Sequence, residues 1–248
     1  MNTSIDILAF GAHPDDIEIG CGGSLILAAD QGLKIGVADL TDAEMSTRGT
    51  VDKRKEETGE ASRLIGLSQR WALGLPDTLV GTDADHVLPI IQLIRETRPR
   101  IVLAPYWEDR HPDHSAVGKL VRKACFLAGV AKVGKGARHR PTSIFHYMIS
   151  HPFEPSFVVD VSAVWNRKIA AIEAYVSQFQ SGGKDQNTAL SQIGFMKFIE
   201  ARSIYFGAMI GAAHGEAFYM PGPVPLGELP SRGDSALSPG ALPPYSMY

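Results

Sequence analysis

Residues 5–25, IDILAFGAHPDDIEIGCGGSL, decide the fold. The apolar run over residues 5–10 is typical of a short buried strand, and residues 17–31 have the length and composition of a helix. A histidine, a proline and two aspartates stand between them, with glycines behind. A strand that leads directly into a helix is the first unit of an α/β sheet. We therefore expect this polar group where a buried strand ends.

The rest of the first half repeats this alternation. Strands are expected at residues 35–40, 70–73 and 101–104, and helices at 52–66, 86–97 and 114–128. Such a pattern implies right-handed βαβ units around a mostly parallel sheet. If the strand order is 3-2-1-4-5, the first and fourth strands are neighbours where the order reverses, which is where open sheets of this kind bind ligands.

The second half of the chain has a different character. Its expected elements are strands at 144–149 and 156–161, helices at 163–179 and 190–206, and a loop at 180–187. The last 28 residues contain seven prolines and four glycines, a composition typical of an extended tail. We expect one Rossmann-like α/β domain over residues 1–220, with helices on both sides of the sheet and a C-terminal α+β extension, and a tail at 221–248.

Composition excludes several classes of protein. The 248 residues are 44% hydrophobic, and their net charge of -3 with no basic block argues against a nucleic-acid partner. No apolar run reaches the ~18 residues of a membrane span, and the opening residues lack a signal-peptide pattern. Two cysteines, Cys21 and Cys125, cannot form a disulfide framework. We expect a soluble cytoplasmic protein that acts on a small molecule.

A second stretch, YWEDRHPDHSA at residues 106–116, echoes the first. Both contain a His-Pro-Asp triplet that follows an expected buried strand and precedes an expected helix. With 8 histidines and 16 prolines in the chain, chance predicts well under one such triplet. We therefore expect the two stretches to form one site beyond the first and fourth strands.

The residue types in the two stretches suit a divalent metal ion. A catalytic zinc takes three protein ligands, which His13, Asp16 and His114 can supply. Asp15 would stay unligated, as a general base requires. His111 could carry a proton or stabilise an oxyanion, and Asp113 could orient one of the imidazoles.

Each stretch alone also has a purely structural explanation. Asp15 with Glu18 matches a capping box, and Asp113 could cap the helix that follows it. The glycines suggest a dinucleotide fingerprint, but Leu25 stands where G-x-G-x-x-G requires its third glycine. We expect these glycines to allow close helix–sheet packing, and Cys21 to be a core residue, with a ligand role as the alternative.

AHPDD at 12–16 and HPDH at 111–114 resemble the LmbE/PIG-L family of zinc-dependent N-acetylglucosaminide deacetylases, over roughly residues 5–220. The segments DLTDAEMSTRGTVDKRKEE, LPDT, YVSQF and IEAR look most like the branch that deacetylates N-acetylglucosaminyl malate in bacillithiol biosynthesis. This resemblance implies one Zn2+ per chain, with Fe2+ as the alternative, and a homo-oligomer, with hexamers common in the branch. It implies zinc ligands His13, Asp16 and His114, the base Asp15, the acid or electrostatic partner His111, the supporting residue Asp113, and a substrate contact at Arg54. Asp77 follows the third expected strand, where it could either bind sugar hydroxyls of the substrate or be a turn residue after Pro76.

The predicted activity is hydrolysis of the N-acetyl group of a small N-acetylglucosamine conjugate. N-acetylglucosaminyl malate is the first candidate, and diacetylchitobiose and free N-acetylglucosamine are alternatives. The rival classes are a metallophosphoesterase, which usually needs two metals, and a nucleotide-binding module. Phe195 stands where bacillus-type relatives carry a tyrosine, so oxyanion stabilisation would rest on zinc and His111. His214, near the end of the matched region, could line the substrate pocket.

Overall fold

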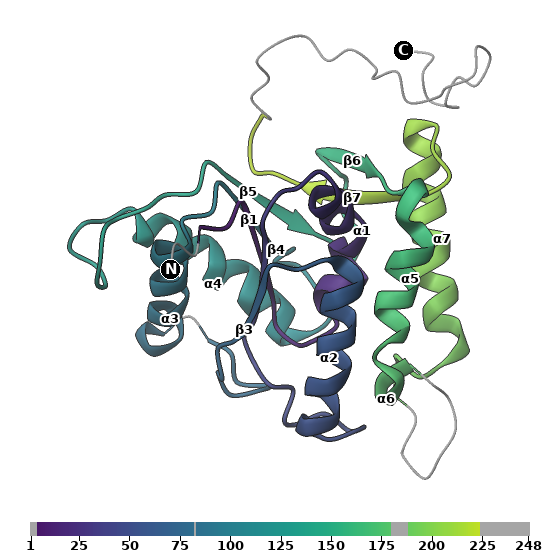
Figure 1. Ribbon diagram of the computed structural model, residues 1–248, viewed down its shortest axis with the longest axis horizontal. Coiled ribbons are helices and arrows are strands. Elements are labelled where there is room, and N and C mark those ends of the chain that lie inside the picture. The colour runs from purple at the N-terminus through teal and green to yellow at the C-terminus, as the bar shows by residue number, and fades with distance from the viewer. Residues whose placement is uncertain (1–3, 82, 180–187, 224–248) are drawn as a thin grey trace.

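The computed structural model describes residues 4–81, 83–179 and 188–223, and it contains a seven-stranded sheet (Figure 1). The elements in chain order are β1 (Ile7–Gly11), α1 (Asp16–Asp30), β2 (Ile35–Asp39), α2 (Val51–Ile65), β3 (Gln69–Ala72), α3 (Ala84–Thr97), β4 (Ile101–Pro105), α4 (Pro112–Ala128), β5 (Ser143–Tyr147), β6 (Phe157–Asp160), η1 (Ser162–Val164), α5 (Trp165–Glu173), α6 (Val176–Phe179), α7 (Ile193–Ile210) and β7 (Gly215–Tyr219).

The strand order is β3-β2-β1-β4-β5-β7-β6, which confirms the predicted order of the first five strands. β1 pairs in parallel with both β2 and β4, so it is the strand at which the chain changes direction across the sheet. The polar residues after β1 and those after β4 therefore leave the sheet at neighbouring strand ends.

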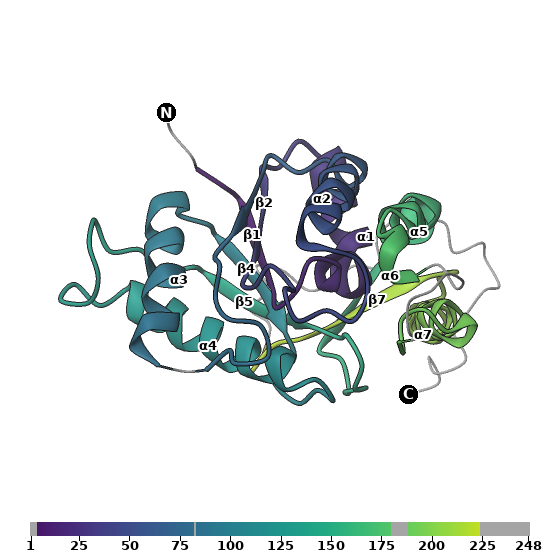
Figure 2. The ribbon, with the colours of Figure 1, turned by 90° about the horizontal axis from the view of Figure 1, so that it is seen from below.

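Helices cover both faces of the sheet. α3 and α4 lie on one side, while α1, α2 and α5 lie on the other with α7 alongside (Figure 2). Successive side chains of β1 alternate between the two layers: Leu8 and Phe10 belong to the core under α3 and α4, and Ile7 and Ala9 to the core under α1. Both cores are apolar, which explains why β1 is a continuous hydrophobic run.

The C-terminal half differs in two places from the predicted elements. The helix predicted at 163–179 is broken into η1, α5 and α6. The backbone at Ser177 bonds to side chains of the first half instead, because its N–H donates to Glu57 Oε1 at 2.7 Å and its carbonyl accepts from Arg48 Nε at 2.9 Å. The other difference is β7, which pairs antiparallel with β5 and β6 and was not predicted.

β7 was not predicted because the buried charge of Glu216 interrupts its apolar pattern. Glu216 is 4% exposed, and its carboxylate accepts from Lys168 Nζ at 2.5 Å, from the backbone N–H groups of Gly23 and Ser24, and from the Ser24 hydroxyl. Lys168 Nζ also donates to the carbonyl of Ile19 at 3.0 Å. This buried pair ties β7 and α5 to the middle of α1.

We predict that Glu216→Gln lowers the free energy of unfolding by about 3–5 kcal/mol, because it leaves the buried Lys168 without its counter-charge. Urea denaturation followed by circular dichroism measures this loss. Glu200→Gln, at an exposed position of α7, is the matched control and should change stability by less than about 0.5 kcal/mol. Equal effects of the two substitutions would contradict a structural role for the buried pair.

His146 on β5 predicts a pH dependence of stability. It is fully buried, its Nδ1 donates to the carbonyl of Pro105 at 2.9 Å, and burial lowers its pKa from 6.5 to about 4. The unfolded chain therefore takes up this proton at higher pH than the folded protein does. The stability that neutral His146 contributes, up to about 3 kcal/mol, is lost as the pH falls from about 6.5 to about 4.

Urea unfolding at neutral pH and at about pH 5 measures this effect, and the difference between wild type and His146→Gln isolates it from the other titrating groups. We expect the stability of the variant to fall less over this interval. An equal fall in both proteins would exclude His146 as its source.

The predicted loop at 180–187 and most of the predicted tail, residues 224–248, lie outside the described residues. The division into a domain at 1–220 and a tail at 221–248 therefore stays a prediction. Within the described ranges, no helix combines the length and apolar character needed to cross a membrane.

Candidate metal and catalytic site

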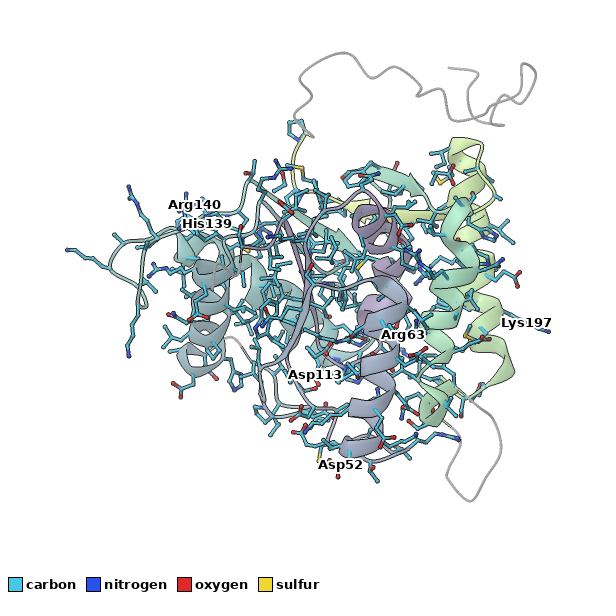
Figure 3. All side chains as sticks on the ribbon, in the orientation of Figure 1. Asp52, Arg63, Asp113, His139, Arg140 and Lys197 are labelled. Atoms are coloured by element: carbon cyan, nitrogen blue, oxygen red, sulfur yellow. The ribbon has the colours of Figure 1, made fainter. Side chains whose placement is uncertain are left out.

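The two polar stretches meet at the carboxyl ends of β1 and β4, as predicted. The imidazole centroid of His13 is 4.9 Å from that of His111 and 5.5 Å from that of His114. The rings of these three histidines line a cavity of about 280 Å³, and Asp15 and Asp16 line it as well. Asp113, labelled in Figure 3, belongs to the first turn of α4 and supports the site from behind.

His13, Asp16 and His114 form a compact set of metal-ligand atoms. One nitrogen or oxygen from each lies within 4.8 Å of the others. His114 Nε2 is 3.0 Å from Asp16 Oδ1, and His13 Nδ1 is 3.7 Å from Asp16 Oδ2. Two imidazole nitrogens and one carboxylate oxygen are a donor set that catalytic zinc sites use. The residues present therefore fit one divalent ion.

A carboxylate holds the other ring nitrogen of each of these two histidines. His13 Nε2 lies 3.1 Å from Asp77 Oδ1 and 3.4 Å from Asp113 Oδ2, and His114 Nδ1 lies 3.0 Å from Asp109 Oδ1. Such contacts fix the tautomer and orientation of a ligating imidazole. They leave His13 Nδ1 and His114 Nε2 facing Asp16.

Asp109 is a residue of the site that the sequence reasoning missed. Its Oδ1 also accepts from the backbone N–H of His111 at 2.9 Å, and its Oδ2 accepts from that of Ser150 at 2.8 Å. Its position two residues before HPDH is a signal for a loop residue near the site. The spacing alone does not show which imidazole it faces.

The electrostatics of the cluster favour a positive charge at its centre. Burial disfavours a charged His114, yet Asp16 and Asp109 outweigh burial and raise the pKa of His114 to about 9. The pKa of His13 is likewise raised, and that of Asp16 is held well below its usual value by the two histidines despite burial. A divalent cation at this point would supply the positive charge that these carboxylates stabilise, in place of the protons on the two histidines.

Asp15 lies beside the three candidate ligand residues without joining them. Its backbone has φ 122°, a strained value for a residue other than glycine, and its side chain makes no capping hydrogen bond. The capping-box explanation is therefore wrong: Glu18 is fully buried and accepts from Arg70 Nη1 at 2.7 Å instead. The Asp15 carboxylate lines the cavity, where a general base would stand.

Arg54 holds Asp15 in place. Its Nη1 donates to Asp15 Oδ2 at 3.1 Å and to the carbonyl of Pro14 at 2.6 Å, and its Nη2 donates to Ser46 Oγ at 3.0 Å. Burial raises the pKa of Asp15 to about 7, against the opposing charge of Arg54. A pKa near neutrality suits a general base. Arg54 lines the cavity at 5% exposure, and its predicted contact with substrate stays a prediction.

His111 is the residue that caps α4, which corrects the expectation that Asp113 could do so. His111 Nδ1 accepts from the backbone N–H of Asp113 at 3.3 Å. Burial, reinforced by the neighbouring His114, lowers the pKa of His111, so the neutral ring carries its hydrogen on Nε2. Among the described residues nothing accepts that hydrogen, which leaves it for a ligand in the cavity.

Asp77 lies behind His13 with both oxygens engaged. Besides its contact with His13, it accepts from the backbone N–H of Met45 at 3.0 Å, and its own N–H donates to Glu44 Oε1 at 2.7 Å. Burial opposes ionisation, but these contacts, above all that with His13, lower the pKa of Asp77 to about 2. Its predicted contact with substrate stays a prediction.

Other residues singled out from the sequence fall in different places. His214 stacks on Trp165 with centroids 4.1 Å apart and does not line the catalytic cavity, so the pocket role considered for it is not borne out. Cys21 is fully buried in the core beside α1, and a side chain on Gly20 would collide with the Tyr147 ring, as expected for close packing. Phe195 of α7 lines the cavity.

Arg110 is a cavity residue that the sequence reasoning also missed. Its side chain is exposed, and within the described part of the chain it forms no ion pair or hydrogen bond. It directly precedes the HPDH motif, but the sequence analysis gave its charge no role. An unpaired guanidinium at the wall of a cavity can bind an anionic group.

Comparison with known proteins gives a consistent picture. The model of the PIG-L family, described as GlcNAc-PI de-N-acetylase, matches residues 8–125. The diacetylchitobiose deacetylase of Thermococcus kodakarensis is 29% identical, over 87% of this chain and 83% of its own length. A probable N-acetyl-alpha-D-glucosaminyl L-malate deacetylase 2 of Bacillus cereus is also 29% identical, over 74% of this chain and 88% of its own length.

Among solved structures, the conserved protein TT1542 of Thermus thermophilus is similar throughout. It is 39% identical, and the superposition covers 94% of this chain and 100% of that one with a TM-score of 0.83. The α/β architecture with helices on both sides of the sheet is therefore shared with a solved relative.

Proposed function

This chain belongs to the PIG-L family of deacetylases, and on that premise we propose that it removes the N-acetyl group from a small N-acetylglucosamine conjugate. The observation that carries the proposal is the convergence of His13, Asp16 and His114 on one point, with the free carboxylate of Asp15 beside them in the same cavity. The products would be acetate and the free amine.

The proposed roles follow from the contacts of each residue. A Zn2+ held by His13, Asp16 and His114 would supply Lewis-acid chemistry to the acetyl carbonyl and to water. Asp15 takes a proton from the attacking water, while Arg54 keeps its carboxylate oriented. His111 donates its Nε2 hydrogen to the oxygen on which negative charge develops. Asp15 then passes its proton to the leaving nitrogen.

Phe195 limits which residues can stabilise the developing charge. Its ring lines the cavity but has no hydrogen to donate. The protein's contribution to oxyanion stabilisation is therefore assigned to His111, whose Nδ1 is already occupied by the N–H of Asp113. This contact sets the ring so that only Nε2 can donate.

The substrate is proposed to be N-acetylglucosaminyl malate. The malate part carries carboxylates, and the exposed, unpaired Arg110 in the cavity wall offers a guanidinium that can bind one. The similarity to the Bacillus cereus protein supports this choice. Diacetylchitobiose, supported by the Thermococcus kodakarensis relative, is the alternative and has no carboxylate for Arg110 to bind.

We predict that Arg110→Gln lowers kcat/KM for N-acetylglucosaminyl malate by about 10- to 100-fold, since a hydrogen bond to a charged group is lost. Turnover of diacetylchitobiose should be unchanged. Steady-state kinetics on both substrates measures the contrast, with Arg63→Gln, an exposed arginine of α2, as the matched control. An equal fall on both substrates would remove Arg110 from substrate selection.

An acetate-release assay on N-acetylglucosaminyl malate, free N-acetylglucosamine and diacetylchitobiose tests the activity itself, with metal content measured on the same sample. We expect acetate release to be fastest from N-acetylglucosaminyl malate, and the metal content to be one zinc per chain. Release of acetate from none of them would overturn the proposal. The homo-oligomer and the cytoplasmic location stay predictions, and light scattering after gel filtration checks the first.

Metal content distinguishes the proposed deacetylase from a metallophosphoesterase, the rival function. The two candidate ligand groups among the described residues, His13/Asp16/His114 and His13/His111/Asp113, share His13. A shared ligand side chain at such short range favours one ion over the two that such enzymes usually hold.

A further inference from the structure

A second cavity of about 310 Å³ lies beside α4 and β5. It shares no lining residue with the catalytic cavity. Figure 3 shows the separation: Arg140, which lines the second cavity, and Asp113, which supports the catalytic site, lie well apart. Whatever binds in this cavity would bind independently of the chemistry proposed above.

The cavity follows from the layout of the fold. α3 and α4 cover one face of the sheet, and the strands beyond β4 extend past these two helices (Figure 2). His146 and Ile144 of β5 line the cavity from the sheet, Phe126 of α4 lines it from the helix, and Met220 lies just after β7. The uncovered part of the sheet is thus walled by largely apolar side chains.

Two arginines bring positive charge to this cavity. Neither Arg122 nor Arg140 forms an ion pair with a carboxylate of the described residues. The guanidinium of Arg122 lies 5.6 Å from the ring centre of Trp107, and that of Arg140 lies 4.9 Å from that of Phe126. Arg140 Nη2 also donates to the carbonyl of Phe126 at 3.2 Å. Packing against a ring restrains a guanidinium and leaves its remaining N–H groups to bind an anion.

His146 adds an unused hydrogen-bond acceptor. Its ring is fully buried, and because a carbonyl can only accept, the contact with Pro105 places the ring hydrogen on Nδ1. The other nitrogen, Nε2, is buried without a partner among the described residues. A buried polar atom in this state is costly, and a hydroxyl group of a ligand would satisfy it.

We propose that this cavity is a second ligand site, for a small organic anion with an apolar body and a hydroxyl group. Arg122 and Arg140 bind the anionic group, and Phe126, which is 61% exposed, covers the apolar body together with Ile144 and Met220. The hydroxyl donates to His146 Nε2. The volume, the mainly apolar wall and the few polar groups that line the cavity are those of small-molecule sites.

Isothermal titration with 4-hydroxyphenylacetate tests this site in the full-length protein. Two matched ligands separate the contributions: 4-hydroxyphenylacetamide lacks the charge, and phenylacetate lacks the hydroxyl. We expect saturable binding of one 4-hydroxyphenylacetate per chain, weakened at least about tenfold by either change. Binding should be the same in zinc-loaded and metal-free protein, because the ligand does not reach the catalytic site.

Paired substitutions locate the binding. Arg122→Gln with Arg140→Gln should weaken binding of 4-hydroxyphenylacetate at least about tenfold. Lys119→Gln with Lys132→Gln removes the same charge from exposed positions that do not line the cavity, and should leave binding unchanged. Circular dichroism and thermal melting confirm that all variants are folded.

Three results would overturn the proposal: no saturable binding to the wild-type protein at millimolar ligand, equal weakening by the arginine and lysine pairs, or binding that requires zinc. Since the two cavities share no residue, any of these results would leave the proposed deacetylase activity untouched. Loss of acetate release would likewise leave this site intact.

Discussion

Replacing Asp15 by asparagine is expected to abolish nearly all acetate release while the protein keeps its metal. The amide cannot take a proton from water, and a positioned general base contributes typically about 10²- to 10⁴-fold to the rate. Metal binding should persist because Asp15 is not one of the three converging residues. Turnover and metal content by mass spectrometry, measured on one sample, give both results.

The asparagine is nearly the same size as the aspartate and can still accept from Arg54, so the geometry around Pro14 should survive. Asp52→Asn, at an exposed position in the first turn of α2, is the matched control and should retain full turnover. Full turnover in Asp15→Asn would remove Asp15 from the mechanism. Loss of the metal together with activity would instead make Asp15 a ligand.

Replacing His114 by alanine is the other change with a large expected effect. It removes one of the three proposed ligands, so zinc affinity should fall by more than about 100-fold and acetate release should fall with it. Asp109→Asn provides a graded comparison, because Asp109 contacts His114 but is not one of the three converging residues. Its effect on zinc affinity should be smaller, about 10- to 100-fold.

Competition with a zinc chelator measures both affinities. The expected order is wild type, then Asp109→Asn, then His114→Ala. If His114→Ala bound zinc as tightly as the wild type, the ligand set would lie elsewhere, and the group of His13, His111 and Asp113 would be the next to test.

The sequence allowed the centre of the site to be predicted, because residue type and strand order carry that information together. His13 and Asp16 follow β1, and His114 follows β4. The hydrophobic runs located the two strands in the sequence, and the strand order assumed for such a sheet made them neighbours, which the structure confirms. Since the carboxyl ends of neighbouring parallel strands open on the same edge, ligand types at both ends had to meet.

The supporting residues could not be predicted in this way. Whether Asp109 faces His114 or His111 depends on the path of the loop after β4, which spacing does not fix. Asp77 shows the same difficulty, because its contact with His13 could not be predicted from its position after β3. Both contacts depend on side-chain directions in loops, where no repeating pattern constrains the backbone.

The backbone of Asp15 distinguishes between its two candidate roles, helix cap and general base. From the sequence, an aspartate before a helix with a glutamate three residues later is a capping box. In the structure Asp15 has positive φ, and Glu18 is turned into the core toward Arg70. The strained backbone directs the Asp15 carboxylate to Arg54 and the cavity, and such strain is found where function requires a particular geometry.

The elements that were misjudged are those that contact distant parts of the chain. β7 carries the buried Glu216, whose partner Lys168 lies on α5. Local patterning cannot show that a charge will be neutralised by a residue so far away. The break between α5 and α6 has the same origin, because the backbone of Ser177 bonds to Arg48 and Glu57.

Zinc titration of metal-free protein, followed by acetate release from N-acetylglucosaminyl malate, tests the one-metal deacetylase most directly. Release should be absent without metal, rise in proportion to added zinc, and stop rising at one zinc per chain. Release at full rate without metal, or a rate that continues to rise to two zinc ions per chain, would contradict a single ion held by His13, Asp16 and His114.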